Sequence, residues 1–374
     1  MEKQQIIVTC AAGVESVTKK ELRDLGFVAP KANDGKITLL GTAEDIAVLN
    51  MFLRTGERVL LALDTFDALS FDELFDKVKA YPWSDILPFN ARILVNGKSK
   101  KSQLFHINSC CSIVKKAILR CLSEKYRRSS FPENGETYRV EFFINENVVT
   151  LALDTSGAGL HKRGYRDLVG EAPIKETLAC ALIDLSGFTP DRAFCDPFCG
   201  SGTIVIEAAR KALGIAPGID RAFDYASWDF LDGNAHYRTA LEMAKAAVKT
   251  DVQLRMYGFD IDKNAVSLAS RHAMRAGVSD YVHLQVQDVS KFSSRYKGGY
   301  IVTNPPYGER LLDLKKANEL YGVLGSVWRN LDNWGMYVIT AAPQFEKYFG
   351  KKCDKTRKLF NANIECRFYE YPPK

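Results

Sequence analysis

The sequence predicts an α/β protein built from two small α+β units and one larger domain with a mostly parallel sheet. At 374 residues, the chain is long enough for two or three domains. Short strand-like and helix-like patterns mix up to about residue 160. Beyond residue 163, strand-like runs alternate with longer helical patterns, which is typical of a parallel sheet covered by helices on both faces.

The first unit, residues 1–60, combines helices and strands. Gly26 follows a run with helical spacing and is a good signal for the end of a helix. Thr42 is placed to cap the next helix, with Asp45 in its favourable first turn. We expect helices over 14–25 and 43–54, and strands over 6–9, 36–40 and 58–66.

The second unit, residues 61–160, continues the mixed pattern. A helical run over 108–122 has one apolar and one basic face, and two strand-like runs flank the polar turn 145–147, which predicts a hairpin. The expected helices are 70–80 and 108–122, the expected strands are 92–98, 138–144 and 148–154, and residues 155–162, with two glycines, are expected to form a linker.

The third part, residues 161–374, carries the alternating pattern of a parallel sheet. Its expected parallel strands are 192–196, 253–260, 282–287, 300–303 and 336–341. The last two strand-like runs, 358–360 and 365–371, are expected to form an antiparallel pair at one edge, which gives seven strands in all.

Positive charge is concentrated in one segment of the chain. Residues 91–130 contain ten Lys and Arg and one acid, whereas the rest of the chain contains 41 basic and 44 acidic residues. A localised basic patch is expected of a polyanion-binding protein. A solvated helix face with a basic bias is the alternative. Phe105, His106 and Tyr126 lie among the basic residues and can stack on bases, which favours nucleic acid.

The nine cysteines include no Cys-x-x-Cys pair and are expected to be reduced thiols in a cytoplasmic protein. We interpret Cys195 and Cys199 as packing residues, so no metal site is predicted. No apolar run is long enough to span a membrane, and the N-terminus lacks the features of a signal peptide. The oligomeric state stays open, and a monomer is compatible with the sequence.

The most informative motif is Asn304-Pro305-Pro306-Tyr307, which ends the apolar run 300–303. Two prolines fix φ and supply no N–H donor, so the chain leaves the sheet rigidly with carbonyls facing outward. The Asn304 side-chain oxygen and the Pro305 carbonyl can accept from a planar amine, and Tyr307 can stack on the ring that carries it. The motif predicts group transfer onto an exocyclic nitrogen of a nucleobase, and a rigid strand-ending turn is the alternative.

A glycine-rich loop follows the first strand of the parallel sheet, where open α/β sheets bind ligands. Its glycines allow a ligand to approach the backbone closely, but their spacing matches neither a dinucleotide loop nor a phosphate loop. The acid at the strand end would repel phosphate and suits an ammonium group. The loop residues expected to bind the ligand are Asp196, Phe198, Gly200, Gly202 and Thr203.

Two later strands also end in acidic residues. Asp260, followed by Ile261, can accept both hydroxyls of a ribose. Asp288, followed by Val289, can accept from the exocyclic amine of an adenine. Either acid alone could be a turn or helix-capping residue. Together with Asn304, the strand ends match an amino acid, a ribose, an adenine and a target amine, which describes S-adenosylmethionine beside its acceptor.

Residues 163–374 resemble the class I S-adenosylmethionine-dependent methyltransferases that modify amines. The whole chain resembles bacterial THUMP-domain RNA guanine-N2 methyltransferases, close to those that act on 23S ribosomal RNA and are often labelled as N6-adenine-specific DNA methylases. The stretches that carry the resemblance are 161–166, 172–177, 196–203, 304–310 and 358–361. Ala362 stands where the family often has Gly, which weakens only the local turn argument.

The resemblance implies a ferredoxin-like domain at 1–60, a THUMP RNA-binding domain at 61–160 and a Rossmann-like class I methyltransferase domain at 161–374. It implies that 172–177 lines the methionine end of the cofactor, which adds Pro173, Lys175 and Thr177. The residues expected to contact RNA are Lys100, Lys101, Gln103, Lys115, Lys116, Arg163 and Arg166.

Segment 215–250 resembles a family insertion near the mouth of the active site. Its aromatic residues Phe223, Tyr225 and Trp228 could equally form a small satellite core.

The first functional hypothesis is methyl transfer from S-adenosylmethionine to guanine N2 in 23S ribosomal RNA. The alternatives are the same chemistry on transfer RNA, N6-adenine methylation of DNA, and a non-catalytic RNA-binding or assembly factor. No separate DNA-reading domain is evident in the sequence. The preference for guanine rests on the resemblance, because no single residue distinguishes the two bases.

Overall fold

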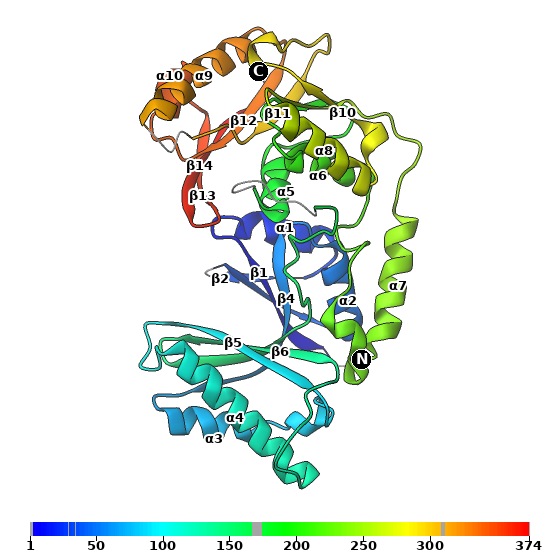
Figure 1. Ribbon diagram of the computed structural model, residues 1–374, viewed down its shortest axis with the longest axis vertical. Helices are drawn as coiled ribbons and strands as arrows, with labels where there is room; N and C mark the ends of the chain where they lie inside the picture. Colours follow the sequence, from blue (N-terminus) through cyan, green and yellow to red (C-terminus); the bar gives the residue numbers. More distant parts are fainter. Residues whose placement is uncertain (1–2, 29, 34, 167–173, 308–310, 374) are drawn as a thin grey trace.

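The computed structural model describes residues 3–28, 30–33, 35–166, 174–307 and 311–373. Two seven-stranded sheets organise these residues and follow one another along the long axis of the molecule (Figure 1). The N-terminal sheet forms the lower part of the view, and the C-terminal sheet forms the upper part. The molecule is therefore elongated, with its two sheets stacked end to end.

The N-terminal sheet has the strand order β2-β3-β1-β4-β7-β6-β5. Neighbouring strands are antiparallel except β5 and β6, which are parallel. Its strands are β1 (Gln4–Cys10), β2 (Lys31–Asn33), β3 (Lys36–Gly41), β4 (Gly56–Asp67), β5 (Arg92–Lys100), β6 (Thr137–Asn145) and β7 (Val148–Asp154). The helices that contribute to its core are α1 (Glu15–Asp24), α2 (Ala43–Phe52), α3 (Phe71–Ala80) and α4 (Ile107–Tyr126).

Strand β4 joins the two N-terminal units into one sheet. Val59, near its start, pairs with Val8 of β1. The same strand pairs with β7 from Leu60 to Asp67. The boundary expected at residue 60 therefore lies inside a continuous strand.

The start of α2 follows the sequence expectation. The Thr42 hydroxyl accepts from the Asp45 backbone N–H at 3.3 Å, and the Asp45 carboxylate accepts from the Thr42 N–H at 2.7 Å. This reciprocal arrangement satisfies two N–H groups that an uncapped helix would leave without partners.

The expected linker at 155–162 is instead part of the buried core. Thr155 and Ser156 are fully buried. Both hydroxyls bind the side chain of Asn50, at 2.8 and 2.6 Å. The glycines suggested flexibility, but the polar residues beside them have partners on α2, about 100 positions earlier in the chain. Such partners cannot be read from local composition.

The C-terminal sheet has the order β10-β9-β8-β11-β12-β14-β13, which confirms the predicted mostly parallel, seven-stranded sheet. Only the last two strands run antiparallel to their neighbours. Its strands are β8 (Ala193–Asp196), β9 (Met256–Asp260), β10 (Val282–Val286), β11 (Gly299–Thr303), β12 (Trp334–Thr340), β13 (Lys355–Asn361) and β14 (Ile364–Tyr371). Its helices are α5 (Glu176–Leu185), α6 (Thr203–Ala212), α8 (Lys263–Arg275), α9 (Leu311–Arg329) and α10 (Phe345–Phe349).

Alternate residues of the central strands face two separate hydrophobic cores. Val302 of β11 packs with residues of α5 and α6, whereas its neighbour Ile301 packs with residues of α9 and α10. Side chains of a strand point alternately to the two faces of the sheet. Because helices cover both faces of the sheet, the sequence of this strand is a continuous apolar run. The carboxyl end of the strand is not covered by these helices.

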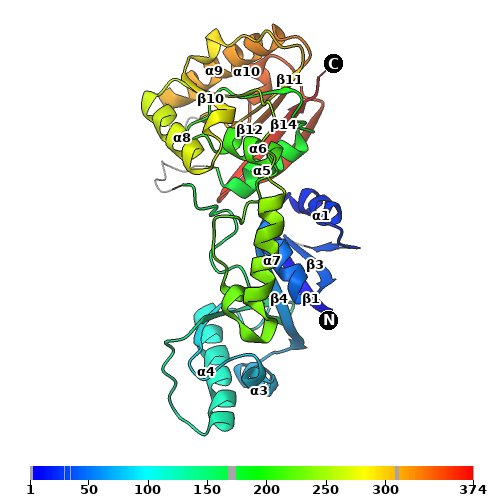
Figure 2. The same cartoon turned by 90° about the vertical axis from the view of Figure 1, so that its right-hand side faces the viewer.

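The segment between α6 and β9 leaves the C-terminal sheet and packs on the N-terminal one, and it contains α7 (Gly233–Ala246), which lies against α2 (Figure 2). Trp228 is fully buried and stacks on Tyr138 of β6, with ring centroids 5.0 Å apart. Its indole N–H donates to the Thr137 carbonyl at 3.0 Å. Phe223 and Tyr225 belong to the same core. The packing alternative is therefore supported for these aromatics.

Candidate active site

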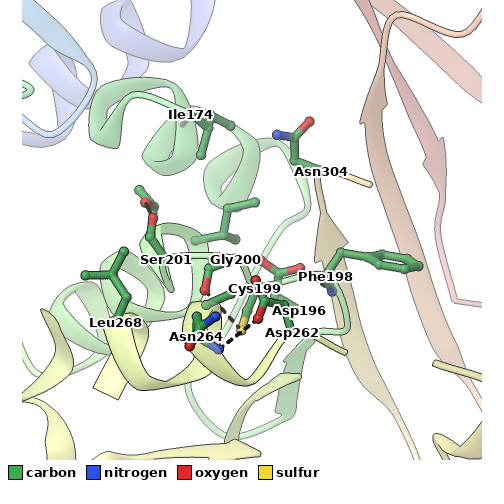
Figure 3. Close-up of a pocket in the computed structure, with 13 residues that line it drawn as sticks. Ile174, Asp196, Phe198, Cys199, Gly200, Ser201, Asp262, Asn264, Leu268 and Asn304 are labelled. Carbon is green, nitrogen blue, oxygen red and sulfur yellow. Dashed lines mark hydrogen bonds between the residues drawn. The ribbon is translucent and has the colours of Figure 1, made fainter. Parts of the chain in front are cut away.

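A cavity of about 410 Å³ opens where β8, β9 and β11 end. The three strands are adjacent and parallel, so their carboxyl ends meet at one edge of the sheet. Figure 3 shows Ile174 and Asn304 on one side of the cavity and residues of α8 on the other. The lining residues are Ile174, Asp196, Phe198, Cys199, Gly200, Ser201, Thr203, Ile204, Asp262, Asn264, Ala265, Leu268 and Asn304.

The loop after β8 curls tightly into α6. Gly200 and Gly202 have φ of +51° and +83°, which side chains rarely adopt. A Cβ on Gly202 would lie 3.0 Å from the Cβ of Ala269 on α8. Both glycines are therefore required by the turn, and the one at position 202 also by the close approach of α6 to α8.

Asp196 ends β8 with a carboxyl group that is almost completely buried, 1% exposed. It accepts from the Thr303 hydroxyl at 2.6 Å and from the Phe198 N–H at 3.2 Å. Burial raises the pKa of this carboxyl to about 7; the two hydrogen bonds oppose the rise, and the Asp260 charge adds to it. A cationic group bound in the cavity would favour the ionised form.

Two acids at the end of β9 have different positions. The Asp260 carboxylate accepts from the Gly200 N–H at 2.9 Å and the Asp262 N–H at 3.0 Å, so it ties the glycine loop to β9. Asp262 lines the cavity and caps α8 by accepting from the Asn264 N–H at 2.8 Å. Asp260 was predicted from the sequence, whereas Asp262, which lines the cavity, was not. The useful signal was that α8 starts directly after β9, which places its first turn at the cavity edge.

Three residues expected to bind the cofactor lie outside the cavity lining, namely Ile261, Asp288 and Val289. Ile261 is 71% exposed beside the cavity residue Asp262. Asp288 is half-buried after β10, and its carboxylate accepts from the Ser290 N–H at 2.8 Å. Hydrogen bonds from the side chain and the backbone of Ser290 lower the pKa of Asp288. Val289 is buried in the core with α9. Asp288 thus has the capping role that the sequence left open, and the position of Val289 is at odds with ligand contact.

The Asn304–Tyr307 motif leaves β11 at the rim of the cavity. Asn304 lines the cavity, and its Oδ1 accepts a hydrogen bond from the Tyr307 hydroxyl. Pro305 is buried, while the Pro306 carbonyl accepts from Tyr321 at 2.8 Å. Burial is the main cause that raises the pKa of Tyr307 well above its ordinary value, so its hydroxyl remains a donor. The tyrosine therefore fixes the orientation of the asparagine amide.

The stretch expected to line the methionine end contributes one residue to the cavity, Ile174. Pro173 lies outside the described residues. Lys175 and Thr177 lie against Glu57 of β4, at 3.2 Å and 2.8 Å. The structure therefore does not bring these two side chains into the cavity. Ile174, which directly precedes Lys175 and lines the cavity, was not among the residues predicted from the sequence.

Two arginines expected to contact RNA are used inside the protein. Arg163 is 2% exposed, donates to the Leu160 carbonyl at 2.6 Å and lies 3.8 Å from the Glu207 carboxylate. Arg166 has a side chain 9% exposed, which donates to the Ile174 carbonyl and pairs with Glu176. These positions correct the predicted RNA contacts, because a buried guanidinium with internal partners is not available to a phosphate.

The remaining residues expected to contact RNA lie on the second N-terminal unit. Lys101 is 68% exposed and pairs with Glu146 at 3.3 Å, and Lys115 pairs with Glu133 at 2.8 Å. The Lys101 pair is exposed, whereas the Lys115 pair is half-buried. Exposed ion pairs contribute little energy, so Lys101 can exchange partners readily. This basic surface consists of Lys100, Lys101 and Gln103 at the end of β5, and Lys115 and Lys116 on α4. It lies far along the long axis from the cavity-bearing sheet (Figure 1).

Two structural features bear on metals and membranes. Within the described ranges, no group of three or more His, Cys, Asp or Glu is arranged to hold a metal ion. In the same part of the chain, no helix has the length and apolar character needed to cross a bilayer.

Three protein-family models match consecutive parts of the chain. Residues 163–370 match an RMKL-like methyltransferase domain. Residues 5–60 match an RlmL ferredoxin-like domain, and residues 68–154 match a THUMP domain.

Similar proteins span nearly the whole chain. The Bacillus subtilis protein YpsC, provisionally named an RNA methyltransferase, is 41% identical over 99% of this chain and 96% of its own length. A Listeria monocytogenes structure, described as a predicted N6-adenine-specific DNA methylase, is 42% identical with a TM-score of 0.94 and covers 100% of this chain and 97% of that one. The structure of SMU.472, provisionally named a methyltransferase and solved in complex with SAH, is 37% identical, with a TM-score of 0.94 and coverage of 100% and 99%.

Proposed function

Since the chain belongs to the RMKL-like methyltransferase family, we propose that it transfers a methyl group from S-adenosylmethionine to the N2 amine of a guanine in 23S ribosomal RNA. Without specifying the target base or the RNA, the chain is an S-adenosylmethionine-dependent RNA methyltransferase. The single observation that carries the proposal is the meeting of Asp196 and Asn304 in one cavity. The Asp196 carboxylate suits a cationic group, and the Asn304 side-chain oxygen suits the N–H donor of an amine.

The residues around the cavity fit S-adenosylmethionine. The buried Asp196 carboxylate, with its raised pKa, suits the ammonium of a methionyl group. The backbone at Gly200 has open space where a Cβ would stand, which admits a ligand close to the main chain. We assign the ribose hydroxyls to Asp262, which lines the cavity, and a loop-shaping role to Asp260. Asp288 remains the proposed contact for the adenine, and Ile261 remains a proposed cofactor contact without an assigned group.

When bound, S-adenosylmethionine supplies a methyl group on a positively charged sulfur. The amine of a nucleobase is a weak nucleophile, because its lone pair is delocalised into the ring. Asn304 Oδ1 has two lone pairs, one of which accepts from Tyr307 and one of which can accept from the target amine. The Pro305 carbonyl is the proposed second acceptor. Two acceptors on the amine hydrogens would orient its lone pair and stabilise the charge that develops on nitrogen.

Tyr307 has two proposed roles. Its hydroxyl turns the Asn304 oxygen, rather than the amide nitrogen, toward the amine. Its ring remains the proposed stacking surface for a base that has left its helix, and such stacking typically contributes ~1–3 kcal/mol.

The distance between the basic surface and the cavity-bearing sheet supports a long substrate. In the proposed division, residues 61–160 bind the RNA backbone and residues 161–374 hold the cofactor and the target base. Lysines at a surface far from the chemistry can contribute affinity only if the substrate extends along the molecule. A structured RNA with an unpaired target base satisfies both requirements.

Nucleoside analysis of the methylated product tests the proposal. Purified protein would be incubated with labelled S-adenosylmethionine and, separately, with 23S ribosomal RNA, transfer RNA and duplex DNA. The expected result is label in N2-methylguanosine from 23S ribosomal RNA. Label confined to transfer RNA would replace the RNA assignment, and label in N6-methyladenosine would contradict the guanine assignment.

A further inference from the structure

Glu57, at the start of β4, meets the catalytic domain at a carboxylate that is only 18% exposed. Its Oε1 accepts from the Thr177 hydroxyl at 2.8 Å. Its Oε2 lies 3.2 Å from the Lys175 ammonium and 3.4 Å from His161 Nδ1. Three side chains of the segment that leads into α5 therefore converge on one acid of the N-terminal sheet.

These contacts flank the cavity residue Ile174. Lys175 is the N-cap residue of α5, and Thr177 lies in its first turn. On the other side, Arg166 donates to the Ile174 carbonyl at 3.2 Å. Ile174 lines the cavity, and the contacts of Arg166 with its carbonyl and of Lys175 and Thr177 with Glu57 hold the backbone around it.

We propose that Glu57 is a positioning residue for the cofactor site, which it shapes by fixing Ile174 and the start of α5 from the N-terminal sheet. The inference rests on the proposed function, because it takes the cavity as the S-adenosylmethionine site. It means that the catalytic domain does not complete its own cofactor site. The required carboxylate lies about 120 positions earlier in the chain.

The electrostatics favour a role in positioning. Burial alone would raise the pKa of Glu57, but the nearby His161 ring, the charge of Lys175 and the hydrogen bond from Thr177 lower it to about 2. The carboxylate thus remains ionised at all ordinary pH values. A side chain held by three partners has little rotational freedom, which is what a supporting residue of a binding site requires.

Binding and kinetic measurements on full-length variants test the inference. Glu57→Gln keeps the size of the side chain but removes its charge. We expect the Kd and KM for S-adenosylmethionine to rise about tenfold, because displaced binding residues lose affinity steeply. With saturating cofactor, kcat should stay within about twofold, since Glu57 does not contact the reacting groups. The matched control is Glu44→Gln, an exposed glutamate of α2, which should leave Kd unchanged.

A double-mutant cycle separates positioning from a general loss of stability. Thr177→Val removes one partner of Glu57 without changing the side-chain volume appreciably, and should raise Kd by about threefold. The double variant should bind no more weakly than Glu57→Gln, because both changes break the same contact.

Several results would overturn the inference. A Kd of Glu57→Gln within twofold of the wild type would do so, as would additive effects in the cycle. If Glu57→Gln does not fold, an unchanged Kd in Thr177→Val would decide against it. Failure of the wild-type protein to bind S-adenosylmethionine would instead contradict the proposed function itself.

Discussion

The strand-end cavity and the junction between the two sheets each contain a buried carboxylate, but the pKa of that carboxylate is shifted in opposite directions at the two places. Asp196 in the cavity and Glu207 at the junction are both essentially inaccessible to water. The pKa of Asp196 is raised to about 7. Burial would also raise the pKa of Glu207, yet the charges of Arg163 and Arg210 bring it below its ordinary value.

The two pKa shifts differ because the positive charge near each carboxylate has a different source. At the junction, the protein supplies its own guanidinium groups, so the network is complete and serves to hold the two sheets together. In the cavity, the described groups that act on Asp196 are two hydrogen-bond donors and another acid. A buried charge without an internal partner costs free energy unless a ligand provides one. Burial alone does not mark a binding site, but burial without a counter-ion does.

The largest effect is expected when the junction loses its cation. Arg163→Met would leave Glu207 buried with less compensating charge, and should lower the free energy of unfolding by about 3–5 kcal/mol. Chemical denaturation measures this directly. RNA affinity of the folded variant should be unchanged, since Arg163 is 2% exposed. A variant of normal stability with weakened RNA binding would restore the original RNA-contact prediction.

The next largest effect is expected at the amine acceptor. Asn304→Ala removes the oxygen that is proposed to orient the target amine, and should reduce kcat by at least about 100-fold. Binding of S-adenosylmethionine, measured by calorimetry, should stay within about twofold, because Asp196 and the glycine loop are untouched. If Asn304→Ala kept its turnover but lost affinity for S-adenosylmethionine, Asn304 would be a cofactor-binding residue and not the acceptor for the target amine.

The contrast between the two regions also explains what the sequence could predict. The loop 196–203 and the motif at Asn304 were identifiable because each lies within a few residues of a strand end, and parallel topology brings strand ends together. Asp262 lies two positions after Asp260 at the same strand end, and only its place as the N-cap residue of α8 indicates that this second acid lies at the cavity edge.

The junction was beyond local reasoning. Arg163 carries no local sign that its charge is compensated inside the protein, because two of its partners are the Leu53 carbonyl at the end of α2 and Glu207 of α6. The contacts of Glu57 with Lys175 and Thr177 likewise join positions about 120 residues apart. Arg163 and Arg166 were therefore predicted as RNA contacts, although Glu207 and Glu176 match their charges inside the protein.

Unlike the two buried sites, the basic surface carries exposed charges, and salt screens their interaction with RNA. Changing Lys100, Lys101, Lys115 and Lys116 to Gln should weaken RNA binding about 10–100-fold at low salt. The slope of log K against log salt should become shallower by about 3. Filter binding over a range of salt concentrations measures both quantities.

A charge-matched control separates this surface from the overall charge of the protein. An unchanged salt slope in the first variant, or an equal change in the control, would remove the basic surface from the RNA site. The control changes four exposed lysines elsewhere, Lys245, Lys249, Lys297 and Lys347, to Gln.

The smallest expected effect is the pH dependence of cofactor affinity, and its measurement tests most directly whether the cavity lacks a cation of its own. Calorimetric titration of the wild-type protein with S-adenosylmethionine should show affinity rising about tenfold or more between pH 5.5 and 7.5. Asp196 loses its proton over that range, and the ligand ammonium keeps its own. Asp196→Asn should bind more weakly and lose this pH dependence. Equal affinity of the wild-type protein at both pH values, or unimpaired binding by Asp196→Asn, would contradict the account.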